Sequence, residues 1–310
     1  MKIVALAGGV GGAKLADGLA QNLAAEDLTV IVNVGDDFTH MGLYICPDLD
    51  TVCYTLAGLA NPDTGWGRSG ESWTVYDHVV KLGGPDWFHL GDKDIATHLE
   101  RTRLLNEGKL LSEIVASFCK TWGVPVNVLP ASNDSIPTMV STKDKGELSF
   151  QDYFVRNQCE PVVTGFRFAG IENATLTPGI LDAIHAADGI IICPSNPYVS
   201  IAPILSVPGL MDEVKKKKVV AVSPIVGGKA IKGPAAKMFQ EMGIDASSVE
   251  VARQYQDFLT GFILDTVDSE YAGEIQRSGI ISLVTNTVMQ TIDDRKRLAS
   301  EVLSFCEGIF

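Results

Sequence analysis

Residues 2–24 read KIVALAGGVGGAKLADGLAQNLA, and this stretch decides the fold. Its first six residues form a short apolar run, which predicts a buried strand. Four of the next five residues are glycines, and leucines then recur at helical spacing. A strand that turns through glycines into a helix presents backbone N–H groups at the positive end of the helix dipole. Such a turn suits a phosphate group.

The glycine segment departs from the two best-known phosphate-binding patterns. Lys14 stands where the dinucleotide fingerprint has a third small residue, and Leu15 stands where a P-loop has Ser or Thr. A tight turn without a ligand is the alternative, although four glycines exceed what a turn requires. Lys14 either reaches a phosphate or lies on a solvated helix face. The candidate phosphate-binding residues are Gly9, Val10, Gly11, Gly12 and Lys14.

Four aspartates follow closely in the sequence. Asp36 and Asp37 come directly after the apolar run 28–34, and Asp48 and Asp50 lie in the segment Cys-Pro-Asp-Leu-Asp-Thr. Each has an ordinary explanation, because aspartate fills turns and caps helices. Four carboxylates near one glycine turn also favour a divalent cation beside a phosphate, as phosphoryl transfer requires. We predict Asp36, Asp48 and Asp50 as ligands of that divalent cation, and Asp50 or Asp37 as the catalytic base.

Further apolar runs alternate with helical segments along the chain. They predict one α/β domain over residues 1–310, with a doubly wound, mostly parallel, Rossmann-like sheet. Ligands bind such sheets at the carboxyl ends of the strands. A helix is expected over residues 51–59, a helical and loop excursion near the active site over 61–125, and a β-hairpin insertion over 135–170. The further strands are expected at residues 126–129, 189–193, 219–222, 262–265 and 280–284.

Composition excludes several classes of protein. The 310 residues are 46% hydrophobic and carry a net charge of −13, so duplex nucleic acid is not an expected partner. No apolar run reaches the roughly 20 residues of a membrane span, and the N-terminus does not resemble a signal peptide. The six cysteines are scattered, as expected of reduced thiols in a cytoplasmic protein. We expect no membrane partner.

Two later strand ends carry polar residues that could contact a nucleotide. Ser195 and Asn196 follow one apolar run, with a proline-stiffened turn as the alternative. Ser223 follows another run and precedes the flexible pair Gly227 and Gly228, which is a weak signal on its own. His89 lies between aromatic and apolar neighbours and is either a packed histidine or a site residue.

With these segments assembled, the chain resembles the 2-phospho-L-lactate transferase family, whose members build the side chain of the deazaflavin coenzyme F(420). The resemblance extends from the N-terminus to about residue 233. Its most specific parts are Cys46-Pro47-Asp48-Leu49-Asp50-Thr51 and Asp86-Trp87-Phe88-His89. The glycine segment, Asn33 to Asp37, Pro194 to Pro197 and Ser223 to Gly228 also match.

The resemblance implies a specific reaction. A phospholactyl or phosphoenolpyruvyl group would move from a guanosine-diphosphate-linked donor to the ribityl hydroxyl of 7,8-didemethyl-8-hydroxy-5-deazariboflavin (Fo), with release of GMP and a requirement for Mg²⁺. It also implies that the acceptor is contacted by Asp50, Thr51, Trp87 and His89. The loops at Ser195, Asn196 and Ser223 would face the guanosine. No residue that can be identified discriminates lactate from enolpyruvate.

The sequence argues against two other functions. A related gluconeogenesis-factor family has the same fold and binds nucleotide sugars in a regulatory role, but the Asp48–Asp50 and Trp87–His89 segments argue against it. An NAD-dependent oxidoreductase is disfavoured by the glycine pattern. The expected partners are small-molecule substrates and a second copy of the chain in a homodimer.

Overall fold

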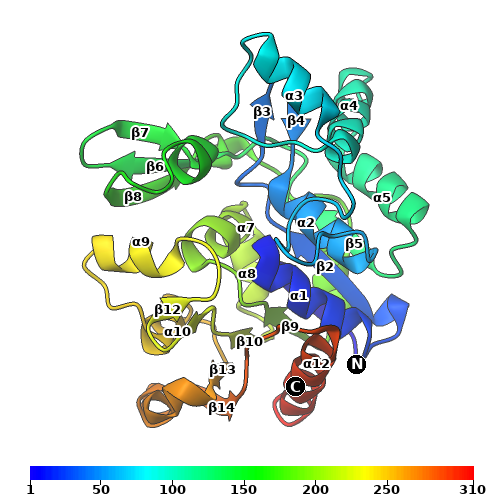
Figure 1. Ribbon diagram of the computed structural model, residues 1–310. Helices are drawn as coiled ribbons and strands as arrows, with labels where there is room; N and C mark the ends of the chain where they lie inside the picture. The colour runs from blue at the N-terminus through cyan, green and yellow to red at the C-terminus, as the bar shows by residue number, and fades with distance from the viewer.

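A seven-stranded parallel sheet forms the centre of the computed structural model, which describes residues 1–310 (Figure 1). The order across the sheet is β14-β13-β10-β9-β1-β2-β5, and every neighbouring pair is parallel. The strands are β1 (Ile3–Ala7), β2 (Leu28–Val32), β5 (Asn127–Pro130), β9 (Gly189–Ile192), β10 (Lys218–Val222), β13 (Gly261–Asp265) and β14 (Ile281–Thr285).

The chain reverses its direction of travel across the sheet between β1 and β9. From β1 it proceeds outward through β2 to β5, and it then returns to β9 and proceeds the other way. Because crossovers between parallel strands are right-handed, the two directions place their helices on opposite faces. The fold is therefore α/β and doubly wound, as predicted, and the ends of β1 and β9 flank the switch point where such folds bind ligands.

Helices cover both faces of the sheet. Helix α1 packs against both α2 and α12, and helix α8 packs against both α6 and α7. The helices are α1 (Gly9–Ala20), α2 (Pro47–Leu56), α3 (Thr74–Lys81), α4 (Asp92–Asn106), α5 (Leu111–Trp122), α6 (Ile180–Ala186), α7 (Ala202–Ser206), α8 (Leu210–Val214), α9 (Ala235–Glu241), α10 (Ser248–Gln254), α11 (Ala272–Arg277) and α12 (Ile292–Glu307). None combines the length and apolar character needed to cross a membrane.

Three small antiparallel sheets stand outside the central one. The predicted hairpin is present as β6 (Thr138–Thr142) and β7 (Gly146–Ser149), and β8 (Val163–Phe168) adds a strand that the sequence pattern did not indicate. The other two sheets are hairpins, β3 (Phe38–His40) with β4 (Leu43–Ile45) and β11 (Ile225–Val226) with β12 (Lys229–Ala230). In Figure 1 the β6–β8 sheet and the α3–α4 region project above the central sheet.

Helix α2 begins four residues earlier than predicted. We expected residues 51–59, whereas the helix spans Pro47–Leu56. Pro47 occupies the first turn, where its missing N–H costs no hydrogen bond. Asp48 and Asp50 then lie in that first turn, where carboxylates interact favourably with the helix dipole. The two aspartates are thus helical residues with fixed directions, rather than loop residues.

Two buried clusters hold the fold together. The larger contains 62 residues and includes the apolar side chains of the central strands and of α1 and α12. The smaller contains Val140, Phe150, Tyr153, Val163, Val199 and Met238. Since Val199 and Met238 belong to the main body, this cluster anchors the β6–β8 sheet beside the switch point.

Candidate active site

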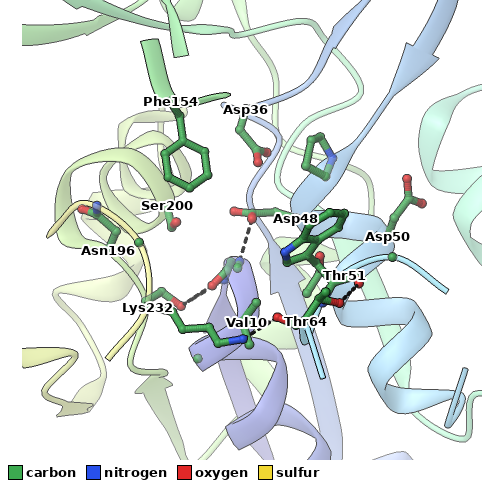
Figure 2. A pocket seen from close by; sticks show the side chains of 18 of the residues that line it. Val10, Asp36, Asp48, Asp50, Thr51, Thr64, Phe154, Asn196, Ser200 and Lys232 are labelled. Atoms are coloured by element: carbon green, nitrogen blue, oxygen red, sulfur yellow. Dashed lines mark hydrogen bonds between the residues drawn. The ribbon is translucent and has the colours of Figure 1, made fainter. Parts of the chain in front are cut away.

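The loops that follow β1 and β9 meet at the switch point. Ser195 Oγ accepts a hydrogen bond from Gly8 N at 3.1 Å and donates one to Gly8 O at 2.8 Å. A cavity of about 900 Å³ opens beside this junction. Figure 2 shows that the two halves of the chain face each other across it, with Asp36 and Asp48 between them.

Glycines in the first loop allow other groups to approach its backbone closely. A Cβ on Gly8 would lie 2.3 Å from Asp48 Oδ2, and a Cβ on Gly12 would lie 2.3 Å from Ser195 Oγ. The Asp48 carboxylate uses this space, because its Oδ1 accepts a hydrogen bond from Gly9 N at 2.6 Å. The glycine loop therefore binds the Asp48 carboxylate at the start of α1, and any ligand would bind beside this carboxylate.

We expect Gly8→Ala to lower the free energy of unfolding by roughly 1–3 kcal/mol, because the added methyl group would overpack this junction. The same substitution at Gly165, whose Cβ would meet no atom within 4 Å, is the matched control. Urea unfolding of both variants measures the difference. Equal stability of the two would contradict the close packing at Gly8.

Asp36 and Asp48 form a buried acidic pair. Both side chains line the cavity, and each residue is 6% exposed. Asp48 Oδ2 accepts a hydrogen bond from Asn33 Nδ2 at 2.9 Å, whereas Asp36 Oδ1 has no partner. Burial and the nearby charge of Asp48 raise the pKa of Asp36 well above its usual range. Burial likewise raises the pKa of Asp48 to about 6.

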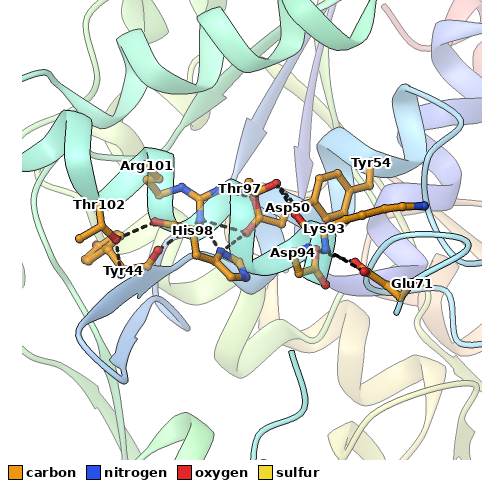
Figure 3. Close-up of polar contacts among 10 residues, drawn as sticks. All are labelled: Tyr44, Asp50, Tyr54, Glu71, Lys93, Asp94, Thr97, His98, Arg101 and Thr102. Atoms are coloured by element: carbon orange, nitrogen blue, oxygen red, sulfur yellow. Dashed lines mark hydrogen bonds and ion pairs between the residues drawn. The ribbon is translucent and has the colours of Figure 1, made fainter. Parts of the chain in front are cut away.

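Asp50 lies apart from this pair, although it also lines the cavity (Figure 2), and Figure 3 shows its polar contacts. Arg101 Nη1 donates to Asp50 Oδ2 at 3.0 Å, and Arg101 Nη2 donates to Asp50 Oδ1. His98 Nδ1 lies 3.6 Å from the same carboxylate, and burial lowers the pKa of His98 to about 4. The predicted grouping of Asp50 with Asp36 and Asp48 around one metal ion is therefore corrected. Asp50 is the acidic half of a buried ion pair.

Asp37, which we predicted as an alternative base, is turned away from the cavity. It is 3% exposed and is not part of the cavity wall. Its Oδ2 accepts a hydrogen bond from the Tyr44 hydroxyl at 3.3 Å, and burial raises its pKa well above the usual range. The carboxylate is thus bonded to Tyr44 of β4 and does not line the cavity.

The predicted phosphate-binding residues divide into two sets. Gly9, Val10, Gly11 and Lys14 line the cavity, and Lys14 Nζ donates to Met289 O at 2.7 Å. Gly12, Gly227 and Gly228 do not line it, and their contact with a phosphate stays a prediction. Gly12 packs under Ser195, and Gly227 N is bonded to the Asp268 carboxylate at 3.1 Å.

The polar residues after β9 and β10 line the cavity, but their side chains are largely engaged with the backbone. Ser195 is bonded to Gly8, as described above. Asn196 Oδ1 accepts from Tyr198 N at 2.9 Å. Ser223 Oγ accepts from Ile225 N at 3.1 Å and donates to Ile225 O at 2.8 Å. These side chains stabilise the loop conformations, so the loop backbone is the part that would contact a ligand.

Aromatic side chains form much of the cavity wall. Trp87 packs edge-on against His40, with ring centroids 5.0 Å apart. His89 Nε2 lies 2.9 Å from the Tyr76 hydroxyl. Thr51 is 6% exposed and lines the same cavity on α2. The aromatic residues of the wall are Tyr54, Trp66, Trp73, Trp87, Phe88, Phe150 and Phe154.

The comparisons with known proteins agree with this arrangement. The sequence model of a family described as 2-phospho-L-lactate transferase CofD matches residues 3–302. The chain belongs to the 2-phospho-L-lactate transferase family. It is therefore an enzyme, a transferase, and the resemblance seen in its motifs is confirmed.

Relatives of this transferase extend over its whole length. A protein from Streptomyces griseus named phosphoenolpyruvate transferase is 40% identical, with 100% of this chain and 99% of that protein covered. A protein from Methanococcoides burtonii named 2-phospho-L-lactate transferase is 38% identical, with 99% and 100% covered. The crystal structure of a UPF0052 family member from Bacillus halodurans has the same fold, with a TM-score of 0.63 at 17% identity over 97% of this chain and 98% of that one.

The cavity of this transferase offers two carboxylates to a metal ion. No three histidine, cysteine, aspartate or glutamate side chains are grouped so that they could hold one. Mg²⁺ is commonly held by one or two carboxylates together with substrate phosphates. The unpartnered Asp36 Oδ1 beside Asp48 fits that smaller ligand set.

Four residues of the site were missed by the sequence analysis, namely Asn33, Arg68, Asp94 and Arg101. Asn33 had a usable signal, because it is a polar residue at the end of an apolar run, and it holds both Asp48 and Val199 O. Arg68, Asp94 and Arg101 lie in segments where charged residues are common. Their burial against distant parts of the chain has no local signature.

Asp94 should reduce stability at neutral pH. It is 8% exposed, and burial, with the charge of Asp50, raises its pKa from near 4 to about 7. The unfolded state then binds fewer protons between these values, so stability falls as pH rises through that window. We expect Asp94→Asn to raise the free energy of unfolding at pH 8 by on the order of 1–3 kcal/mol, and to change nothing below pH 4. Urea unfolding at both pH values tests this, and a less stable variant at pH 8 would contradict it.

Proposed function

We propose that this transferase moves a phospholactyl or phosphoenolpyruvyl group from a guanosine-diphosphate-linked donor to Fo. The terminal ribityl oxygen of Fo forms a bond to the phosphorus that carries the lactyl or enolpyruvyl group. The bond between that phosphorus and the bridging oxygen of the diphosphate breaks, and GMP leaves with the electron pair. The product is an intermediate of coenzyme F(420) biosynthesis.

One observation carries this proposal. A single cavity is lined both by the α1 N-terminus with the Asp36–Asp48 pair, which suits phosphate, and by aromatic side chains, which suit a flat ring. Its volume of about 900 Å³ lies near the upper end of the range for small-molecule sites, as two substrates held together require. The names of the relatives in the family support the same chemistry.

Mg²⁺ is the proposed cofactor, and Asp36 and Asp48 would hold it. When bound, the ion would neutralise charge on the diphosphate and on the leaving phosphate. The N–H groups at the start of α1 and the ammonium group of Lys14 would bind phosphate oxygens on the same side. Gly9, Val10 and Gly11 would therefore contact the donor, and the loops at Ser195, Asn196 and Ser223 would face its guanosine.

We propose that Asp50, held by Arg101, orients the acceptor rather than removing its proton. An aspartate in a bidentate ion pair is a weak base, and Asp37 does not reach the cavity. Phosphoryl transfer has a loose transition state that requires orientation and charge neutralisation more than a strong base. The hydroxyl proton then passes to bound water as the new bond forms.

Transfer is expected to be direct, with no covalent enzyme intermediate. The serine hydroxyls at 195 and 223 are bonded to backbone groups, and burial raises the pKa of the Cys46 and Cys193 thiols. None is an activated nucleophile. The proposed function is tested by incubating the enzyme with Fo, Mg²⁺ and either guanosine-linked donor and identifying the product by mass. Absence of product with both donors would contradict it, as labelled protein after incubation with donor alone would contradict direct transfer.

We expect His89→Ala to raise the KM for Fo by about fivefold, because an aromatic contact to a flat ring contributes roughly 1 kcal/mol. The KM for the donor should change less than twofold, since His89 lines the cavity among aromatic side chains and is not part of the glycine loop. His78→Ala, an exposed histidine on α3 outside the cavity wall, is the control. Equal effects on both KM values would indicate general disruption instead.

The regulatory alternative binds nucleotide sugars and catalyses no transfer. Membership in the transferase family favours the first function, and the aromatic wall suits a deazaflavin better than a sugar. We also propose that the enzyme acts in the cytoplasm as a homodimer. Sedimentation velocity measures its oligomeric state.

A further inference from the structure

Arg68 and Asp94 are charged side chains of the cavity wall that the proposed reaction does not use. Both line the cavity, and Asp94 Oδ2 would lie 3.3 Å from a Cβ built on Gly67, the neighbour of Arg68. The two belong to different elements, because Arg68 precedes α3 and Asp94 lies in the first turn of α4. Their proximity is thus built by the fold.

An aspartate in the first turn of a helix usually accepts hydrogen bonds from the free backbone N–H groups there, and Asp94 does not. Glu71 already accepts hydrogen bonds from Lys93 N at 2.8 Å and from Asp94 N at 3.0 Å (Figure 3). The Asp94 carboxylate is 8% exposed, and its Oδ1 has no hydrogen-bond partner. A buried acceptor without a donor is costly, so a missing donor at this point is expected to come from a ligand.

Arg68 lacks a partner as well. Three cationic side chains line the cavity, and two of them donate to backbone oxygens, Lys14 to Met289 and Lys232 to Thr64. Arg68 makes no hydrogen bond or ion pair, and its Nε is buried without an acceptor. Its guanidinium group instead lies over two rings, 5.3 Å from the centroid of Tyr54 and 5.7 Å from that of Trp122.

A free donor beside a free acceptor matches the polar edge of a pyrimidinedione. That edge carries an N–H between two carbonyl groups, and the deazaflavin ring of the proposed acceptor has such an edge. We infer that Asp94 accepts the ring N3–H and that Arg68 donates to an adjacent ring carbonyl, so that the two residues select and orient the acceptor. This assignment rests on the proposed function and adds specificity-determining residues to it.

The surroundings support a ring at this position. Stacking on Tyr54 and Trp122 limits the movement of the guanidinium, which reduces the entropy lost on binding. Trp66 and Trp73 belong to the same wall and offer aromatic faces. The contacts of Asp50 and His89 with the acceptor would then fix its other parts, while the polar edge enters between α4 and the loop before α3.

Fluorescence titration of the full-length enzyme with Fo and with its N3-methyl derivative, both at pH 8, tests the assignment. The wild-type protein should bind Fo about 10- to 100-fold more tightly than the methylated compound, as expected for a hydrogen bond to a charged group. Asp94→Asn and Arg68→Met should each weaken Fo binding by a similar factor. Asp94→Asn should also reduce the preference for Fo over its N3-methyl derivative to less than threefold.

Two controls separate recognition from general damage. Asp77→Asn changes an exposed carboxylate on α3 outside the cavity wall, and it should leave the N3-methyl preference unchanged. Calorimetric titration with GDP and Mg²⁺ should give affinities within twofold of the wild-type value for all variants. An Asp94→Asn protein that retains the full N3-methyl preference would overturn the assignment. A wild-type protein that binds neither compound would instead overturn the proposed function.

Discussion

Replacing Asp36 with asparagine is expected to lower kcat by about 100- to 1,000-fold, corresponding to roughly 3–4 kcal/mol in the barrier. Asp36 is the carboxylate of the acidic pair that retains an unpartnered oxygen, so it is the group most available to a cation on the substrate phosphates. Asparagine preserves the shape and removes the charge. Steady-state kinetics at saturating Mg²⁺ and donor measure the loss.

The same substitution should not damage the fold. An ionised Asp36 is costly at neutral pH, because burial and Asp48 raise its pKa. Asp36→Asn should therefore be at least as stable as the wild-type protein in urea unfolding. Asp63→Asn, an exposed carboxylate outside the cavity wall, is the control and should retain full activity. A kcat within threefold of the wild-type value would show that Asp36 has no part in transfer.

Replacing Arg101 with methionine should have the largest effect on stability. The side chain is 1% exposed and makes a bidentate ion pair with Asp50. Removing one partner of a buried pair leaves an uncompensated charge and costs roughly 3–5 kcal/mol. His98 cannot compensate, because it is neutral near pH 7. Urea unfolding at pH 7 should show this loss.

The double variant Asp50→Asn/Arg101→Met separates charge from packing. It removes both charges, so it should recover at least half of the stability lost in Arg101→Met. Arg103→Met, on the exposed face of α4, should cost less than about 1 kcal/mol. If the double variant is as unstable as the single one, the loss arises from packing of the arginine and not from the unpaired carboxylate.

The central sheet could be predicted because its signal is local. All seven strands lie within one or two residues of the predicted ones, and the five inner strands are apolar runs that are almost completely buried, as strands covered on both faces require. The β3–β4 hairpin and β8 could not be predicted. The first has only three residues in each strand, and the sequence of β8 is neither a continuous apolar run nor a strict alternation of apolar and polar residues.

The site was predictable in its residue types and less so in their partners. The aspartates and the glycine segment stood out at strand ends, and Asp36 and Asp48 do lie together. The partner of Asp50 is Arg101, which lies 51 residues away on α4. The sequence pattern of that helix does not distinguish this arginine from any other. Contacts of this kind depend on how helices pack, and the sequence does not encode them locally.

The strand order has a consequence for how the protein is made. β1 is synthesised first, yet its partner β9 and the serine that bonds to Gly8 follow 187 residues later. At roughly 5–20 residues per second, one edge of a fully apolar strand stays unpaired on the ribosome for roughly 10–40 s. Such an edge is a template for wrong pairing. Newly made chains should therefore depend on chaperones that shield this edge until the second half of the sheet emerges.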